Sequence, residues 1–196
     1  MRPFLTICLL FLAASGAAQQ ADIAALGKRC LPMAPLSTLS AIVRVESGSN
    51  ANAMDIDFPK SLLKRWRLPN GALRLKRQPA TPEEALAWLR YFEQHAISVD
   101  VGLMQVSTAE AERRGLAPES LLDPCNNLRA GWEILEEAYQ TEVSTYGPGQ
   151  TALQHALSRY NTGDTERGFD NGYVRRVLAA ISELPDPSQP REEKRK

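Results

Sequence analysis

The stretch P-L-S-T-L-S-A-I-V-R-V-E-S, from Pro35 to Ser47, predicts a helix that carries one acidic residue in an unexpected place. Leu39, Ile42 and Val43 recur at helical spacing and mark the face that a helix buries. Glu46 follows three residues after Val43 and four after Ile42, so it falls on the same face. A carboxyl group is therefore expected where a leucine would be usual.

The position of Glu46 has two interpretations. Burying an ionised carboxylate without a partner is costly, so such a group finds donors or stays protonated with a raised pKa. A glutamic acid that is neutral near pH 7 can donate a proton, which makes Glu46 a candidate general acid. In the simpler interpretation, the Ser-Gly-Ser-Asn that follows lets a frayed helix end turn Glu46 to solvent. The helix alone favours this simpler interpretation.

Both ends of the chain differ from its middle. Residues 1–18 resemble a secretory signal, with Arg2, an apolar run from Phe4 to Ala14 and small residues suited to cleavage. That run is too short to span a bilayer, and no membrane span is expected in the mature chain. Residues 184–196 are rich in proline and then in charge, which is typical of a disordered tail. Residues 19–183 remain as one domain, and export predicts a periplasmic location.

The cysteine count and the charge balance restrict the function further. Cys8 lies within the signal, so the mature chain keeps Cys30 and Cys125, and an even number in an exported chain favours one disulfide over a metal site. Lys and Arg together number 23, as do Asp and Glu, so no overall charge attracts the chain to nucleic acid or to an anionic membrane. Residues 58–78 are the exception, because they are basic with no acidic residue. A solvated face explains this segment more simply than contact with an anionic polymer.

The rest of the sequence predicts a mostly helical α+β domain with a short β-hairpin or extended segment. Helical periodicity, caps and stop signals predict five more helices, which span about residues 81–95, 108–114, 124–145, 151–158 and 171–181. Residues 98–106 alternate enough for a short strand or extended loop, with Gly102 where a backbone must approach closely.

Four short motifs occur in order at predicted helix ends or loops: V-E-S-G at residues 45–48, G-L-M-Q-V at 102–106, Y-N-T-G at 160–163 and G-Y-V at 172–174. Together they resemble the soluble lytic transglycosylases, lysozyme-like enzymes that cut the glycan strands of peptidoglycan. The resemblance covers residues 30–181. The start C-L-P at residues 30–32 and D-P-C-N-N-L-R-A-G at 123–131 are similar to the small branch that accompanies conjugation and type IV secretion machines.

This resemblance implies a role for individual residues. Glu46 would be the catalytic acid, and in this branch Cys30 and Cys125 are paired. The residues implied to contact the sugar or to shape its cleft are Ser47, Met104, Gln105, Tyr160, Asn161 and Tyr173, with the Tyr173 hydroxyl reaching the acid. Met104 and Tyr173 have an alternative role as ordinary core residues, and Gln105 as a loop amide. No metal or cofactor is implied.

One departure from the family concerns the partner of Glu46. The plain soluble enzymes keep a compact loop with a polar residue between the glutamate and G-L-M-Q, whereas about fifty residues intervene here. Candidates for a group that bonds to Glu46 are Asp55, Asp57, Ser98 and Asp100.

The resemblance implies cleavage between N-acetylmuramic acid and N-acetylglucosamine, with 1,6-anhydro ends as products and components of a secretion, conjugation or pilus machine as partners. Two other functions remain open. A hydrolytic lysozyme of the same fold would use Asp55 or Asp57 as a second carboxylate. A non-catalytic peptidoglycan-binding subunit would keep the cleft without needing the acid.

Overall fold

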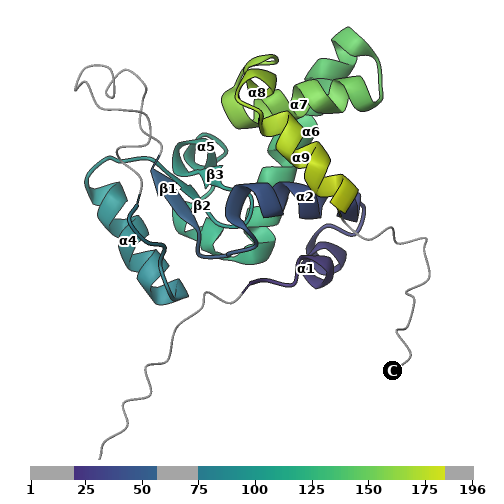
Figure 1. Ribbon diagram of the computed structural model, residues 1–196. Helices are drawn as coiled ribbons and strands as arrows, with labels where there is room; N and C mark the ends of the chain where they lie inside the picture. The colour runs from purple at the N-terminus through teal and green to yellow at the C-terminus, as the bar shows by residue number, and fades with distance from the viewer. Residues whose placement is uncertain (1–19, 57–74, 184–196) are drawn as a thin grey trace, which may run out of the picture.

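Helices dominate the computed structural model, which describes residues 20–56 and 75–183 (Figure 1). The helical elements are α1 (Ile23–Cys30), α2 (Leu36–Ser47), α4 (Pro82–Gln94), α5 (Thr108–Arg113), the 3-10 helix η1 (Pro118–Leu122), α6 (Pro124–Tyr146), α7 (Gln150–Thr162), α8 (Arg167–Asp170) and α9 (Tyr173–Glu183). The strands are β1 (Met54–Ile56), β2 (Val99–Val101) and β3 (Val106–Ser107). The predicted signal, the predicted tail and all but the last four residues of the basic segment 58–78 lie outside the described residues.

The helix α2 has the bounds that its sequence predicts, and its apolar face is buried as expected. Leu39, Ile42 and Val43 are each 0% exposed. The helix ends at Gly48, whose φ of 60° is a left-handed conformation that glycine adopts without steric cost. The Gly48 amide donates to the Arg44 carbonyl and closes the last turn. Glu46 is thereby held in the final turn of a helix whose apolar face lies in the core.

The small sheet is antiparallel, in the order β1-β2-β3. Met54 pairs with Val101, and Val101 pairs with Val106 on its other side. The extended segment predicted at residues 98–106 is present, but a turn at residues 102–105 divides it into two strands. This turn contacts α2 and α6, because Ser47 of α2 bonds to the Leu103 carbonyl and Asn127 of α6 accepts from the Met104 amide.

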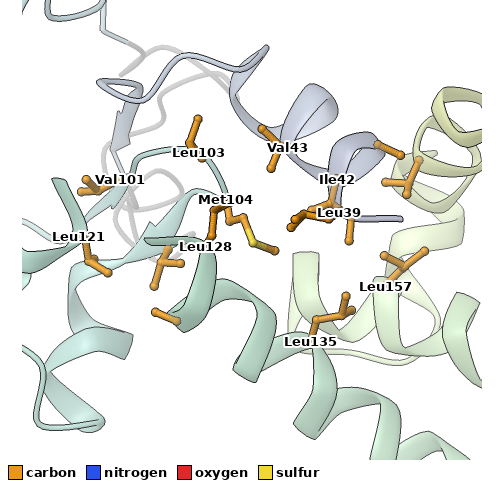
Figure 2. Packing of buried hydrophobic residues seen from close by; sticks show 14 of the residues in the cluster. Leu39, Ile42, Val43, Val101, Leu103, Met104, Leu121, Leu128, Leu135 and Leu157 are labelled. Carbon is orange, nitrogen blue, oxygen red and sulfur yellow. The ribbon is translucent and has the colours of Figure 1, made fainter. Parts of the chain in front are cut away.

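The core joins α2, the turn after β2, and the paired helices α6 and α7 (Figure 2). Met104 extends from the turn toward Leu39 of α2, and its side chain is 0% exposed (Figure 2). Gly131 leaves the room for it, because a Cβ there would lie 2.6 Å from the Met104 Cβ. The end of α2, the turn after β2 and the helices α6 and α7 therefore share one core.

Two predictions about helices need adjustment. The helix predicted at residues 151–158 runs on to Thr162, so Tyr160 and Asn161 lie in its last turn. The helix α1, which the sequence analysis did not include, ends at Cys30. The disulfide between Cys30 and Cys125 is confirmed, with Cα atoms 5.3 Å apart, and it joins the end of α1 to the first turn of α6. The mostly helical α+β fold is confirmed as well.

No helix within residues 20–56 and 75–183 has both the length and the apolar character that crossing a membrane requires.

Candidate functional site

Glu46 is brought to the C-terminal end of α2 beside the first residue of α9. The Tyr173 hydroxyl donates a hydrogen bond of 2.5 Å to Glu46 Oε1, across 127 residues of sequence. Tyr173 is 1% exposed, so its hydroxyl is held by the packing around it. This contact was implied by the family resemblance, and the structure places the two side chains together.

The surroundings of Glu46 favour its protonated form. Burial raises the pKa of Glu46 from 4.5 to about 7, while the hydrogen bond from Tyr173 and the positive charge of Arg176 act in the opposite direction. Removal of water dominates because an ionised carboxylate loses its hydration there. Since Tyr173 donates to Oε1, Oε2 is the oxygen left to carry a proton. The residue as a whole is half-buried, because one side of it lines a cleft.

The cleft has two compartments that meet at Glu46 and Gln105. The first has a volume of about 430 Å³ and is lined by Glu46, Asp100, Gln105, Val106, Ser107, Ala109, Glu110, Arg113, Ile134, Arg159, Tyr160, Asn161 and Gly163. The second has a volume of about 370 Å³ and is lined by Glu46, Ser47, Asn50, Ala53, Met54, Asp55, Leu75, Gln78 and Gln105. An extended polymer can therefore pass Glu46 with a compartment on each side.

Gln105 stands between the two compartments in a left-handed backbone conformation, with φ of 48°. A non-glycine residue adopts this conformation at some cost, which the neighbouring contacts must offset. The Gln105 side chain donates to the carbonyls of Gly102 at 2.9 Å and Ala53 at 3.2 Å. These bonds hold its amide where Gln105 lines both compartments, and its contact with sugar stays a prediction.

Met104 takes the alternative role that the sequence left open. Its side chain lies wholly in the core, so it packs beneath the cleft in this structure. Its backbone, however, belongs to the site, because the Tyr160 hydroxyl donates to the Met104 carbonyl at 2.6 Å. Tyr160 lines the first compartment and links the turn to α7.

Ser47 also secures this turn. Its hydroxyl lies 2.8 Å from the Leu103 carbonyl and 3.1 Å from the Val43 carbonyl, so it joins the end of α2 to the G-L-M-Q turn. Ser47 lines the second compartment. Its contact with sugar stays a prediction.

Asn161 is exposed at the mouth of the first compartment. Its Oδ1 accepts a bond of 2.9 Å from Asn171 Nδ2. Asn171 in turn accepts from the Tyr173 amide at 2.8 Å through its own Oδ1, and from Arg176 Nη1 at 3.1 Å through its carbonyl. Asn171 thus connects Asn161 of α7 to the residues of α9 that surround Glu46.

Three residues of the site were missed by the sequence analysis. Asn127 is 0% exposed, accepts from the Met104 amide at 2.8 Å and donates to the Val101 and Leu121 carbonyls at 2.7 and 3.0 Å. It lies within the motif at residues 123–131, which was interpreted through its family resemblance and through Cys125. Asn171 directly precedes the G-Y-V motif, and Arg176 follows Tyr173 by three residues, a spacing that marks helical neighbours.

The candidates for a partner of Glu46 have separate positions. Asp55 and Asp100 face each other across β1 and β2, and each lines one compartment together with Glu46. The Ser98 hydroxyl lies 3.2 Å from that of Ser107 and 3.3 Å from that of Thr108. It therefore connects the residue before β2 to the end of β3 and the start of α5. Asp57 lies outside the described residues. The hydrogen bond to Glu46 comes instead from Tyr173.

Within the described part of the chain, no group of three or more His, Cys, Asp or Glu side chains is arranged to hold a metal ion.

Comparison with known proteins extends these observations. The sequence model of the transglycosylase SLT domain matches residues 26–180. Protein virB1 of Rhizobium radiobacter is 34% identical over 157 residues, which cover 80% of this chain and 59% of that protein. Protein virB1 of Agrobacterium fabrum is 32% identical over 171 residues, 86% of this chain and 64% of that protein.

Type IV secretion system protein virB1 of Brucella abortus is 31% identical over 168 residues, which cover 83% of this chain and 65% of that protein. The chain thus spans 59% to 65% of the length of these curated relatives. No solved structure matches it. The family match covers the whole cleft, from the helix that carries Glu46 to the helix that begins with Tyr173, and the chain belongs to the transglycosylase SLT domain family.

Proposed function

We propose that this chain is a peptidoglycan lytic transglycosylase. It cleaves the β-1,4 bond between N-acetylmuramic acid and N-acetylglucosamine and leaves 1,6-anhydro-N-acetylmuramic acid ends. Membership of the transglycosylase SLT domain family supports the substrate class. The observation that carries the chemistry is a glutamic acid with a pKa raised to about 7, held between two compartments of an open cleft.

In the first step, Glu46 acts as a general acid. With its pKa at about 7, a large fraction of the carboxyl carries a proton near neutral pH, and the proton can pass to the bridging oxygen. The bond between that oxygen and C1 of the muramic acid then breaks, and positive charge develops at C1. Tyr173 keeps Glu46 Oε1 in place throughout, since its hydroxyl bonds to that oxygen.

In the second step, the ionised Glu46 acts as a base. It takes the proton from the C6 hydroxyl of the same muramic acid, whose oxygen attacks C1 and closes the 1,6-anhydro ring. Nucleophile and electrophile belong to one sugar, so the step benefits from effective molarities on the order of 10⁵ M or more when the two are well oriented. One carboxyl thus performs both proton transfers, and no water is consumed.

A second candidate is hydrolysis, and the position of Asp55 favours testing it. Most glycosidases use two carboxylates, and Asp55 lines the same compartment as Glu46. Mass spectrometry of the digested glycan separates the two reactions, because an anhydro end is lighter than a reducing end by one water. Reducing ends that disappear in an Asp55→Asn variant would establish hydrolysis and refute the transglycosylase mechanism.

The acid is tested by Glu46→Gln, which keeps the shape of the side chain and removes its titration. We expect release of soluble fragments from peptidoglycan to fall by roughly 10²-fold or more, with thermal unfolding and strand binding nearly unchanged. Glu133→Gln, on the exposed face of α6, is the matched control and should cleave normally. A Glu46→Gln protein that digests peptidoglycan at close to the wild-type rate would show that the acid is misassigned.

We also propose a biological setting: an exported, periplasmic protein that opens the wall for a type IV secretion machine. The support is similarity to proteins named virB1, one of them a type IV secretion system protein. Replacing the chromosomal copy with Glu46→Gln should lower transport by the machine as much as deleting the gene. Full transport with Glu46→Gln, but none in the deletion strain, would favour the non-catalytic subunit.

A further inference from the structure

Arg159 is a charged residue of the cleft that the proposed reaction does not use. It lies on α7, directly before Tyr160, and lines the compartment that also contains Glu46 and Asn161. Its side chain is 37% exposed, so part of the guanidinium is open to whatever enters. General acid catalysis by Glu46 needs no such cation, so another reason for its position is required.

A buried carboxylate beneath the cleft holds Arg159 in place. Glu142 of α6 is 2% exposed, and its Oε1 accepts from Arg159 Nε at 2.7 Å, with Nη2 at 2.6 Å. Its Oε2 accepts from the Thr165 hydroxyl at 3.0 Å. Arg159 is therefore fixed along one edge, and Nη1 has no hydrogen-bond partner within residues 20–56 and 75–183.

This arrangement suits recognition of an anion better than stability alone. A buried ion pair often stabilises a fold no more than apolar residues of the same size would. A guanidinium fixed on one edge, by contrast, presents its remaining N–H groups in a planar geometry that matches a carboxylate. The orientation is set before the ligand arrives, which reduces the entropy lost on binding.

Other charged residues lie near Arg159. Arg113 and Glu110 of α5 line the same compartment and pair with each other. Asp100 lines the compartment from β2. Asp164 lies just after α7. Backbone hydrogen bonds are the main cause that lowers its pKa, and the positive charge of Arg159 is the smallest cause. Arg159 is thus the cation of this compartment that a buried carboxylate orients.

We propose that Arg159 is a substrate-binding residue that accepts a carboxylate carried on the muramic acid of the glycan strand. This inference rests on the proposed function and specifies the substrate further. The carboxylate has two possible sources with the same chemistry. It belongs to the lactyl group when the strand carries no peptide, and to the attached peptide when the lactyl group is amidated.

Steady-state cleavage of three glycan substrates tests the proposal. The first carries its peptides, the second has been stripped by an amidase so that the lactyl carboxylate is free, and the third is the stripped strand with that carboxylate converted to a neutral methylamide. Arg159→Lys keeps the charge and loses the planar fork. The double variant Arg159→Gln with Glu142→Gln removes both charges, so no carboxylate is left buried alone.

For both variants we expect KM to rise about tenfold on the substrate that supplies the carboxylate, with a smaller change in kcat and no change on the neutral strand. A rise limited to the peptide-bearing strand assigns the peptide carboxylate. A rise limited to the stripped strand assigns the lactyl group. Arg129→Gln, an exposed arginine of α6 outside both compartments, should match wild type on all three.

Equal KM changes on all three substrates, or no change on any, would overturn the proposal. Binding of the glycan strand to Glu46→Gln, measured with and without Arg159→Lys, separates the role of Arg159 in binding from the proposed cleavage reaction. If wild type cleaves no substrate but binding still depends on Arg159 and on the carboxylate, only the proposed function fails. If wild type forms anhydro products and binding ignores both, only the role of Arg159 fails.

Discussion

At the residue scale, the proposed reaction depends on how far the protein raises the pKa of one carboxyl. Burial favours the protonated acid that the first proposed step needs, whereas Tyr173 and Arg176 favour the ionised base that the second proposed step needs. Arg176 lies over the Tyr173 ring, 5.8 Å from its centroid, and bonds to the Asn171 carbonyl. With a pKa of about 7, Glu46 has both its protonated and its ionised form populated near neutral pH. This suits a group that is proposed to act first as an acid and then as a base.

The pH dependence of cleavage follows from this balance. A group with a raised pKa is protonated below that pKa and loses its proton above it, so kcat/KM should fall as the pH rises through about 7. Arg176→Gln removes a charge that lowers the pKa of Glu46, and we expect the alkaline fall to move to higher pH. The pH profile of kcat/KM on peptidoglycan fragments provides the measurement.

Arg175→Gln is the matched control for this prediction, because Arg175 is the exposed neighbour on α9 and does not act on the pKa of Glu46. Its profile should coincide with that of wild type. A profile for Arg176→Gln that keeps its midpoint, or that moves to lower pH, would contradict the electrostatic role of Arg176.

At the element scale, the turn between β2 and β3 positions the middle of the cleft. Asn127 binds the turn and its surroundings through three hydrogen bonds, and Gly102 makes room for it, since a Cβ there would lie 2.3 Å from Asn127 Nδ2. Gly102 also has φ of 79°, a conformation that favours glycine. The position of Gln105 therefore depends on an asparagine that itself has no access to the cleft.

Replacing Asn127 tests this dependence. Asn127→Ala leaves one amide and two carbonyls without their partners in a buried place, and we expect a loss of about 3 kcal/mol in the free energy of unfolding. Denaturation with urea measures that loss, and kcat at a temperature where the variant stays folded should fall as well. Asn126→Ala, on the exposed side of the same helix turn, should change neither quantity. Normal kcat in folded Asn127→Ala would mean that Gln105 does not need this support.

At the scale of the whole molecule, the disulfide connects the start of the domain to its longest helix. Cys30 and Cys125 are separated by 95 residues, and the closed loop contains α2, the whole sheet and α4. Restricting a loop of this length in the unfolded chain stabilises the fold by about 4 to 5 kcal/mol in the entropic model. Neither cysteine lines a compartment of the cleft, so the contribution of the bond is to the fold.

The double variant Cys30→Ala with Cys125→Ala should therefore unfold at a lower temperature, with a loss of about 2 to 5 kcal/mol in the free energy of unfolding. Calorimetry measures the loss. Cleavage at low temperature should stay within about twofold of wild type, since an intact core still holds Glu46, Tyr173 and Gln105. An unchanged unfolding temperature would show that the disulfide contributes little.

The sequence alone determined what depends on local spacing and local caps. The period of Leu39, Ile42 and Val43 predicted α2 and placed Glu46 on its buried face, and the even number of mature cysteines predicted the disulfide. The order of four short motifs indicated the family from the sequence. The helix follows from interactions between residues that are close in sequence. The disulfide follows from residue type, because two cysteines can pair in only one way.

The tertiary structure decided which side chains meet and which of them face the cleft. It placed Met104 in the core and Gln105 at the cleft, although the two are neighbours, because the left-handed turn directs them apart. It brought Tyr173 to Glu46 across 127 residues. The pKa of Glu46 belongs to the same class of property, since removal of water and the placement of distant charges exist only when the whole core has packed.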